Sequence, residues 1–472
     1  MPSQPDTSLS SYGADTRIQW DDQLIERYNV SGPRYTSYPT ALEFTEQVTS
    51  TDYIESLQSI ERDKPISVYV HIPFCWHVCY YCACNKVVTR DYTKVNPYIN
   101  ALEQEIALVA NNLNQQKVTQ LHWGGGTPTY LNKQDRKRLV DLLNRYFNLA
   151  SGNDIEASIE VDPRTVSCDE ISELRQLGFN RISLGIQDFN IKVQTAVNRI
   201  QSFEDTQALV VKSRQEQFRS ISFDLIYGLP HQTVESFSET LDQVIELRPD
   251  RLSVFNYAHL PHRFGPQRRI NADQLPTSEE KLAILHLTID KMTQAGYVYV
   301  GMDHFALPDD ELALAQQRGE LHRNFQGYTT QKECDLIGLG VSSIGSINGH
   351  YFQNQKEINA YYNELADNSL ATWRGVKVTD DDIIRKNVIF QIICNFNLEF
   401  SEVEQAFKIE FWAYFNDVKP TIEAMASDGL IELTEHGLSV TAKGRLFVRN
   451  VCMAFDGNLL AMAAMPGYSK AI

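Results

Sequence analysis

The sequence has no long apolar run, no secretory signal and no excess of positive charge. No uninterrupted apolar stretch of its 472 residues approaches about 18 residues, the length that a membrane-spanning helix needs. The N-terminus lacks a basic segment followed by an apolar one, so we expect no signal peptide. Lys and Arg number 43 against 60 Asp and Glu, a net charge of −17, whereas nucleic-acid binding needs clustered cations. We therefore expect a cytoplasmic protein without a membrane or nucleic-acid partner.

Cysteine is scarce as well, but half of it lies in one place. Four of the eight cysteines are scattered and are expected to be structural, in keeping with a reducing compartment: Cys168, Cys334, Cys394 and Cys452. The other four form a C-x3-C-x2-C-x-C motif within ten residues: Cys75, Cys79, Cys82 and Cys84. Thiolates this close together favour one compact centre of a soft metal.

The first three of these cysteines have the spacing found in radical S-adenosylmethionine (SAM) enzymes. Electron-transfer clusters usually take four thiolates, whereas three thiolates leave one iron of a [4Fe–4S] cluster open. In those enzymes the open iron binds the methionine end of SAM, and reductive cleavage gives a 5′-deoxyadenosyl radical. Two alternatives stay open: a disulfide, and structural zinc, which usually takes two separated Cys or His pairs. Cys84 is not expected to be a fourth ligand.

Short β-rich runs alternate with amphipathic helix patterns in the first two thirds of the chain. Strands are predicted at 66–72, 118–123, 155–161, 181–185, 221–226 and 252–257, and helices at 97–113, 135–147 and 237–247. Strand–helix repeats of this kind indicate a parallel sheet. The predicted fold class is therefore α/β, a partial (β/α)6 barrel with 297–300 as a further strand.

The C-terminal unit is predicted to be mainly helical and winged-helix-like. Helices at 380–396, 401–406 and 414–426 precede a hairpin of 430–433 and 438–441. Because the chain is acidic, we expect this unit to pack on the barrel or cover it rather than bind DNA. The predicted division is an extended polar N-terminal arm at 1–60, the barrel at 61–310, a barrel extension and connecting segment at 311–377, the C-terminal domain at 378–457 and a tail at 458–472.

Polar and glycine-rich residues follow the predicted strands, where β/α barrels place their active sites. The run Gly124-Gly125-Gly126-Thr127-Pro128 follows the second strand, and glycine lets the backbone approach a ligand closely. Asp224 stands out because a charge within an apolar run needs a partner. The other residues expected at this mouth are Glu160, Gln187, Arg199 and Ala258. Each of these features also has a purely structural interpretation, as a tight turn, a solvated strand end or an ion pair.

Three later segments are less informative. His262-Arg263 and Arg268-Arg269 follow the sixth strand and are either a clamp for carboxylates or ordinary surface residues. The segments 322–330 and 338–344 combine glycine with polar or aromatic residues, and a plain loop is the default expectation for both.

Together these motifs resemble the family of oxygen-independent coproporphyrinogen III oxidases. The resemblance runs from about residue 28 to 455, which is nearly the whole chain. Its most specific pieces are 34–40 (RYTSYPT), 69–75 (YVHIPFC), 82–86 (CACNK), 184–189 (LGIQDF), 224–230 (DLIYGLP) and 324–330 (NFQGYTT).

The resemblance implies a reaction, cofactors and partners. Two propionates of coproporphyrinogen III would be oxidatively decarboxylated to vinyl groups, giving protoporphyrinogen IX, after the deoxyadenosyl radical takes a hydrogen atom from the propionate β-carbon. The implied cofactors are a [4Fe–4S] cluster and two molecules of SAM. The partners would be the tetrapyrrole substrate and a low-potential electron donor, and we expect a monomer.

The resemblance also implies roles for individual residues. Cys75, Cys79 and Cys82 would bind the cluster. The first SAM would contact Tyr69, Gly125, Glu160 and Ile344, and the second would contact Tyr81, Gly126, Thr127, Gln187, Arg199, Asp224 and Ala258. Phe325 and Gln326 match positions important for activity. The arm and the C-terminal domain would close over the barrel mouth, which shields a carbon radical from solvent.

Three rival functions remain to be separated. A haem-trafficking relative would keep the cluster but lack the 82–86 continuation and the 34–40 segment, both of which are present. A radical-SAM enzyme for another tetrapyrrole would share the chemistry. A zinc-bound winged-helix regulator would contain zinc and no sulfide.

Overall fold

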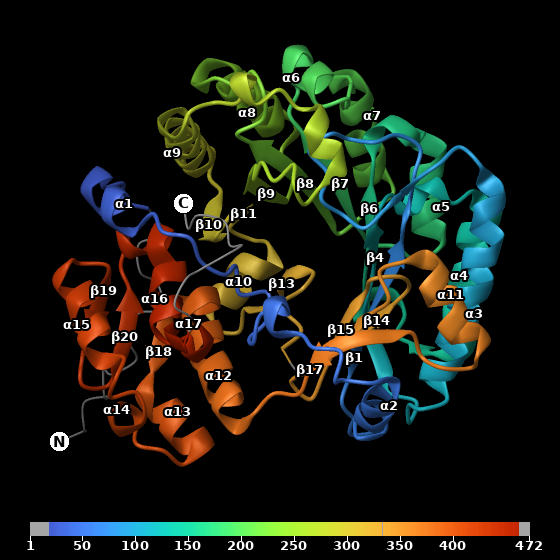
Figure 1. The fold of residues 1–472 in the computed structure, drawn as a ribbon. Helices are drawn as coiled ribbons and strands as arrows, with labels where there is room; N and C mark the ends of the chain where they lie inside the picture. The colour runs from blue at the N-terminus through green and yellow to red at the C-terminus, as the bar shows by residue number, and fades with distance from the viewer. Residues whose placement is uncertain (1–17, 333, 462–472) are drawn as a thin grey trace, which may run out of the picture.

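The computed structural model of the chain describes residues 18–332 and 334–461. Its centre is a curved sheet of parallel strands that lie side by side in chain order (Figure 1). These strands are β1 (Ile66–Ile72), β4 (Lys117–Gly125), β6 (Glu156–Val161), β7 (Arg181–Gln187), β8 (Ser220–Tyr227) and β9 (Arg251–Asn256). The predicted partial (β/α)6 barrel is confirmed, because β/α units in sequential order build this half-ring.

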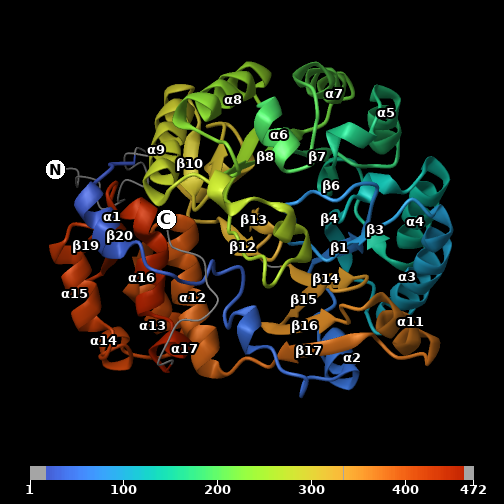
Figure 2. The ribbon, with the colours of Figure 1, turned by 45° about the horizontal axis from the view of Figure 1, so that its top comes forward.

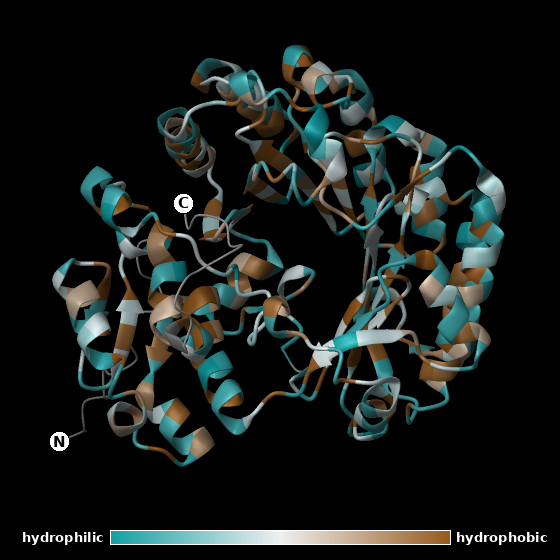
Figure 3. Cartoon of the chain, in the orientation of Figure 1, coloured by the Kyte–Doolittle hydropathy of each residue, from teal (hydrophilic) through white to brown (hydrophobic). Residues whose placement is uncertain are grey.

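Helices cover the outer face of the half-ring. They are α3 (Val95–Ala110), α4 (Lys133–Tyr146), α5 (Cys168–Gln176), α6 (Ile191–Ala196), α7 (Phe203–Gln215), α8 (Val234–Leu247) and α9 (Ser278–Gln294). Capping boxes begin α5 at Ser167, α8 at Thr233 and α9 at Thr277, where side chains satisfy the first free backbone N–H groups. Figure 3 shows polar residues on the outward sides of these helices and apolar ones towards the strands, as expected of amphipathic helices.

Both edges of the parallel sheet are extended. Beside β1, the strand β14 (Asp335–Leu339) adds in parallel, and β15 (Ile344–Ile347), β16 (His350–Asn354) and β17 (Thr372–Val376) continue antiparallel, with α11 (Ile358–Ala366) between the last two. Beside β9 lie β11 (His304–Ala306) and β10 (Val298–Gly301). The predicted strand near 297–300 therefore exists, but it joins through antiparallel β11 and not as another β/α unit.

The predicted extended polar arm is wrong in its local structure. It contains α1 (Asp22–Tyr28), capped by Asp21, and α2 (Ser50–Gln58), which begins with a capping box at Thr49. The segment 34–40 is not helical, as expected. Apolar and aromatic side chains of the arm are nevertheless buried, including Tyr35 and Tyr38 at 1% exposure. These side chains pack the arm against the rest of the protein.

The C-terminal unit has the predicted helices and hairpin, with two changes. It comprises α12 (Asp380–Asn395), β18 (Asn397–Glu399), α13 (Phe400–Phe407), α14 (Phe411–Tyr414), α15 (Lys419–Ser427), β19 (Ile431–Leu433), β20 (Gly437–Val440), α16 (Val448–Ala454) and α17 (Gly457–Ala461). The predicted helix at 414–426 is two helices, because Pro420 stands in the first turn of α15, where its missing N–H is tolerated. The unpredicted strand β18 completes a small sheet of order β18-β20-β19.

One apolar core runs from the barrel into the C-terminal unit and includes residues of the arm. The segment 311–321 carries α10 (Glu311–Gln317), and a small hairpin of β12 (His322–Asn324) and β13 (Gly327–Thr329) follows it. This hairpin corrects the expectation of a plain loop at 322–330. Figure 2 shows it between the strands of the half-ring and the C-terminal helices. Within the described part of the chain, no helix is both long and apolar enough to cross a bilayer. Most of the predicted tail, 462–472, lies outside the described residues.

Candidate active site

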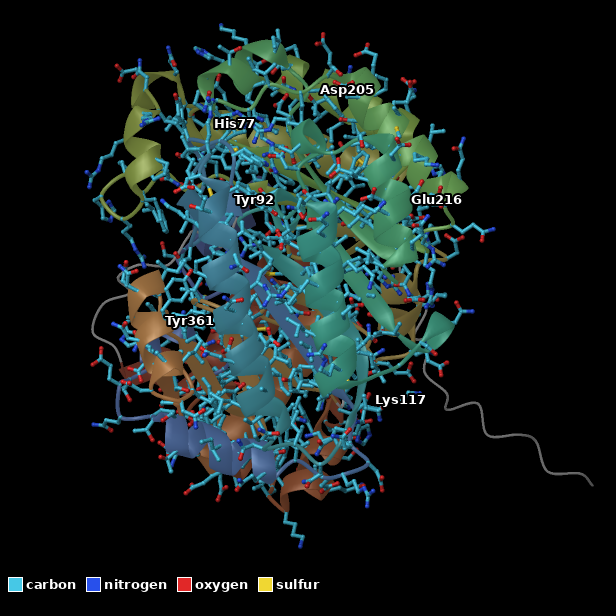
Figure 4. The ribbon with its side chains drawn as sticks, turned by 90° about the vertical axis from the view of Figure 1, so that its right-hand side faces the viewer. His77, Tyr92, Lys117, Asp205, Glu216 and Tyr361 are labelled. Carbon is cyan, nitrogen blue, oxygen red and sulfur yellow. The ribbon has the colours of Figure 1, made fainter. Side chains whose placement is uncertain are left out.

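The cysteine loop lies at the C-terminal end of the parallel strands. It follows β1, and its two short strands β2 (Phe74–Cys75) and β3 (Val87–Val88) pair with each other. Figure 4 places His77 of this loop near one end of the helical layer and Lys117, where β4 starts, near the opposite end. The loop is therefore where β/α barrels carry their chemistry.

A cavity of about 470 Å³, here called the barrel cavity, lies inside the half-ring and opens beside the cysteine loop. It brings together most of the residues predicted from the sequence. Those lining it are Cys75, Cys79, Tyr81, Cys82, Gly125, Gly126, Thr127, Glu160, Gln187, Arg199, Asp224 and Gln326. Residues more than 250 positions apart thus converge on one space, as a shared active site requires.

Two arginines donate to one of the three thiols. Arg164 Nη2 lies 3.3 Å and Arg199 Nη1 lies 3.4 Å from Cys79 Sγ, so two cationic side chains face this sulfur. A hydrogen bond with Cys84 lowers the pKa of Cys82 to about 6, whereas burial raises the pKa of Cys75 to about 11. Among the described residues no three His, Cys, Asp or Glu side chains meet around a single ion. Thiolates that each bind a different iron of a cluster do not need such a common point.

The same two arginines are held by Asp162, which the sequence analysis did not select. Asp162 pairs with Arg164 at 2.6 Å and with Arg199 at 3.2 Å. Burial acts to raise the pKa of Asp162, but Arg199 and Arg164 outweigh it and lower this pKa to about 2. The sequence signal was the Asp162-Pro163-Arg164 turn directly after β6. This carboxylate therefore stays ionised and fixes the arginines against Cys79.

The triple glycine is required by contacts within the protein. A Cβ on Gly124 would lie 2.7 Å from Glu160 Oε1, and one on Gly126 would lie 2.5 Å from the carbonyl oxygen of Pro73. Gly125 has φ +116° and would collide with the ring of His71. Larger residues at these positions would displace the carboxylate and the cysteine loop. The three glycines therefore determine the shape of the cavity mouth, independently of any ligand that binds there.

The cavity wall is polar where a barrel interior is usually packed with branched apolar side chains. Glu160 accepts hydrogen bonds from the backbone N–H of Gly125 and from His122, each at 3.2 Å. Ser183 donates to Asp224 at 3.0 Å. Burial and the nearby charge of Glu160 raise the pKa of Asp224 to about 6. These two carboxylates offer acceptors for amino or hydroxyl groups of a ligand inside the half-ring.

Gln187 is held in an unusual backbone conformation. It ends β7 after a register shift between Gly185 and Gln187, and its φ is +68°. A left-handed conformation at a non-glycine residue is costly and tends to occur at functional sites. The side chain of Gln187 faces the barrel cavity together with Arg199.

Four predicted site residues do not line the barrel cavity. Tyr69 lies behind it, stacked on His122 and hydrogen-bonded to His71 at 3.0 Å. Ile344 begins β15 and its backbone packs on Gly338. Ala258 lines a second cavity of about 350 Å³. The ring of Phe325 packs on those of Phe44 and Tyr351, while its neighbour Gln326 faces the barrel cavity.

The arginines of the possible carboxylate clamp contact their own surroundings. Arg268 donates to the carbonyl of Pro261 at 3.1 Å, and Arg269 lies over the ring of Tyr80. Arg263 lies over the ring of Phe264. None of the three lines the barrel cavity among the described residues. The clamp stays a prediction, and these contacts suit a segment that supports the cysteine loop.

Comparison with known proteins identifies two family models along the chain. Residues 69–244 match the radical SAM superfamily, and residues 378–447 match the HemN C-terminal domain. The first match covers the cysteine loop and five of the parallel strands, and the second covers most of the C-terminal unit.

Relatives match over nearly the whole chain. The oxygen-independent coproporphyrinogen III oxidase of Salmonella typhimurium is 52% identical over 97% of this chain and 100% of its own length. The enzyme of that name from Pseudomonas aeruginosa is 52% identical over 93% of this chain and 96% of its own. The solved structure of coproporphyrinogen III oxidase (HemN) from Escherichia coli, described as a radical SAM enzyme, superimposes with a TM-score of 0.90 at 51% identity. It covers 94% of this chain and 100% of its own.

Proposed function

This chain belongs to the family of oxygen-independent coproporphyrinogen III oxidases, and from this premise we propose how its own residues serve the reaction. The enzyme oxidatively decarboxylates two propionates of coproporphyrinogen III to vinyl groups and so forms protoporphyrinogen IX. The observation that carries the assignment is the likeness from end to end together with one cavity that unites the three cysteines, the glycine run and Glu160.

The residues of the barrel cavity suit the cofactors that the family implies. Cys75, Cys79 and Cys82 would hold a [4Fe–4S] cluster, and the Arg164 and Arg199 donors to Cys79 suit an anionic sulfur. Together with SAM, the cluster supplies the 5′-deoxyadenosyl radical that removes a hydrogen atom from the substrate. Glu160 would bind the first SAM through its amino group, since the carboxylate faces the cavity beside the glycine run.

A second SAM would occupy the part of the cavity walled by Tyr81, Gln187, Arg199 and Asp224. The polar wall there suits a ribose or an adenine better than it suits a packed side chain. The arm and the C-terminal unit would cover the substrate, which protects a carbon radical from water and from stray hydrogen donors. A low-potential electron donor, a monomeric state and a cytoplasmic location complete the proposal.

The deciding experiment is anaerobic. The cluster is reconstituted and reduced, SAM and coproporphyrinogen III are added, and 5′-deoxyadenosine and protoporphyrinogen IX are quantified together. We expect two nucleosides per protoporphyrinogen, and loss of both products with Cys79→Ala. Cys168→Ala is the matched control, because Cys168 begins α5 away from the barrel cavity.

Each of the other outcomes either contradicts part of the proposal or supports a rival function. SAM cleavage without vinyl product indicates a radical SAM enzyme for another substrate. One nucleoside per protoporphyrinogen contradicts the proposal that two SAM molecules are consumed. Stable haem binding without SAM cleavage favours a trafficking protein, and zinc without sulfide removes the radical mechanism altogether.

A further inference from the structure

A short surface segment beside the cysteine loop concentrates positive charge on an acidic protein. Residues 261–270 contain three exposed arginines: Arg263, Arg268 and Arg269. The nearest acidic residue in the sequence is Asp273, whereas the whole chain has a net charge of −17. Within the described part of the chain, the three arginines contact a backbone carbonyl and aromatic rings rather than carboxylates. A local excess of this kind attracts an acidic partner to one place, while the rest of the surface repels it.

The segment 261–270 is fastened to the cysteine loop. Gln267 Nε2 donates to the carbonyl of Tyr81 at 3.0 Å, and the guanidinium carbon of Arg269 lies 5.3 Å from the ring centre of Tyr80. Cys79 and Tyr81 line the barrel cavity, but Tyr80 between them is not among the described residues that line it. Through this one aromatic ring, the basic segment therefore contacts the residue that is bonded directly to Cys79, a proposed cluster ligand.

A second segment, residues 191–200 around α6, contacts the same part of the loop. The backbone N–H of Tyr80 donates to the carbonyl of Val197 at 2.9 Å. Ile270, next to Arg269, packs in one small apolar cluster with Val193 and Val197, and the ring of Tyr80 packs against that cluster. The two segments therefore adjoin each other and hold the loop between Cys79 and Tyr81.

The two segments expose the kinds of side chain from which protein interfaces are built. Ile191 and Ile200 are 62% and 59% exposed, and Lys192 is exposed as well. Interfaces between proteins combine apolar contacts with polar and charged ones, whereas a small free anion has no use for an exposed isoleucine. The following side chains are here called the outer patch: Ile191, Lys192, Ile200, Arg263, Arg268 and Arg269. The outer patch therefore suits an acidic protein.

The proposed reaction needs a protein partner at this place. Each cleavage of SAM takes one electron, which has to come from a donor outside the chain. SAM and the substrate would fill the barrel cavity, so the donor has to approach the cysteine loop from another side. The outer patch adjoins the loop, and none of its six side chains is among the described residues that line the barrel cavity. A carrier docked there reaches the loop while the cavity is occupied.

We propose that the outer patch docks a small acidic one-electron carrier protein, which reduces the cluster from outside the barrel cavity. One electron passes from the carrier, which is oxidised by one electron, to the cluster, which is reduced by one; no bond is formed or broken and no proton is transferred. This inference rests on the proposed function and supplies the chemical class and the docking site of its electron donor.

The test compares two reductants of the cluster-loaded, full-length enzyme under anaerobic conditions. Reduced flavodoxin, a small acidic flavin protein, is the carrier, and photoreduced 5-deazariboflavin is an uncharged reductant that needs no docking site. The rate of cluster reduction is followed by the loss of its visible absorption. We expect Arg263→Glu/Arg268→Glu to slow reduction by flavodoxin roughly 10- to 100-fold at low ionic strength, as for loss of electrostatic steering, and to leave reduction by deazariboflavin unchanged. Arg263→Lys/Arg268→Lys keeps the charge and should stay near the wild-type rate.

Two further readouts separate the charged from the apolar part of the outer patch. Raising the ionic strength should slow reduction of the wild type by flavodoxin and hardly affect Arg263→Glu/Arg268→Glu, because salt screens exposed charges. Ile191→Ser/Ile200→Ser should weaken binding of flavodoxin roughly tenfold even at high ionic strength, since the isoleucines contribute by burial of apolar surface.

A control variant makes the same change in net charge at the opposite end of the strands. Arg62 is exposed and precedes β1, and the side chain of Arg145 is 65% exposed. Arg145 comes shortly before β5 (Asn148–Leu149), which pairs with the start of β4. Arg62→Glu/Arg145→Glu should therefore leave the rates with both reductants close to those of the wild type.

The possible failures are distinguishable. If Arg263→Glu/Arg268→Glu slows flavodoxin no more than the control variant does, or slows both reductants equally, the docking site is overturned while the oxidase function stands. A raised KM for coproporphyrinogen III with deazariboflavin as the reductant overturns it in favour of a carboxylate clamp. If the Glu variant loads no cluster, Arg263→Gln/Arg268→Gln decides by the same comparison. If the wild type forms no vinyl product even with deazariboflavin, the proposed function fails first.

Discussion

Two groups of arginines in this protein have different kinds of partner. Beside the cysteine loop, Arg164 and Arg199 share the carboxylate of Asp162 and both donate to Cys79. Where the N-terminal arm meets the barrel and the C-terminal unit, Arg34 pairs with Asp303, and Arg449 donates to the backbone carbonyls of Gly32 and Pro33. The first group is held around one carboxylate and one thiol, whereas the second joins distant segments of the chain through a carboxylate and through backbone carbonyls.

The difference indicates what each group is for. A buried cation with a fixed carboxylate keeps its neighbours in place before any ligand arrives, which suits the support of the cysteine loop. An arginine that donates to backbone carbonyls of another segment ties that segment in place, as Arg449 does for the residues directly before Arg34. Mutation of the first group should therefore affect both the stability of the protein and the cysteine loop, because its arginines contact Asp162 and Cys79 together.

The largest effect is expected from breaking the paired group. Asp162→Asn leaves Arg164 and Arg199 without their carboxylate, and removing one partner of a buried ion pair costs about 3–5 kcal/mol. We expect a fall of that size in the free energy of unfolding, measured by denaturant titration, together with low iron content after anaerobic purification, because the two arginines also position Cys79.

An exposed ion pair gives the control for this prediction. Asp154 pairs with Lys117 at 3.3 Å, and its side chain is 71% exposed. Asp154→Asn should change stability by no more than about 1 kcal/mol and leave the iron content intact. A loss for Asp162→Asn no larger than that of Asp154→Asn would show that the paired group does not hold the cysteine loop.

A third buried charge extends the comparison to neutral partners. Glu105 of α3 is fully buried and accepts hydrogen bonds from the Gly340 N–H, Asn354 and Tyr361, and none of the described Lys or Arg side chains pairs with it. Burial raises its pKa from 4.5 to about 7, although these three donors act against the shift. Neutral donors thus compensate a buried charge less completely than Arg164 and Arg199 compensate Asp162.

The raised pKa predicts a pH dependence. Between about pH 4.5 and 7 the folded state holds a proton on Glu105 that the unfolded state has lost, so the stability from this group falls as pH rises through that window. Relative to Glu105→Gln, the wild type should lose about 2–3 kcal/mol of unfolding free energy from about pH 5 to pH 8. Parallel stability profiles for the two proteins would mean that Glu105 is ionised throughout.

The regular part of this fold was predictable from local pattern. Strand β1 occupies the predicted range, and β4, β6, β7, β8 and β9 lie within one or two residues of theirs, because short apolar runs between helical patterns are typical of buried parallel strands. The antiparallel strands β15 to β17 were not predicted, since they form only by pairing in turn on β14. The arm was misjudged because its helices are short and its apolar residues find partners only in tertiary contacts.

The residues of the candidate site, too, were predictable from the sequence only in part. The cysteines, the glycine run, Glu160 and Asp224 were visible because each follows or ends a predicted strand. Asp162 was passed over although it stands in the same turn, because its role depends on Arg199, 37 positions away. Arg164 was passed over for the same reason, because its contact with Cys79, 85 positions away, exists only after the barrel has formed.

The smallest effect is expected at the fourth cysteine of the loop. Cys84 is exposed and its thiol is hydrogen-bonded to Cys82. Its position alone therefore does not distinguish a fourth cluster ligand from a neighbouring thiol. A fourth thiolate would fill the iron position that SAM needs, whereas three thiolates leave it open. Cys84→Ala should therefore keep its iron and sulfide content and its SAM cleavage, while Cys82→Ala loses all three. Loss of iron from Cys84→Ala would mean that the loop contributes four thiolates, and the paired arginines at Cys79 would then support an electron-transfer cluster instead of an open one.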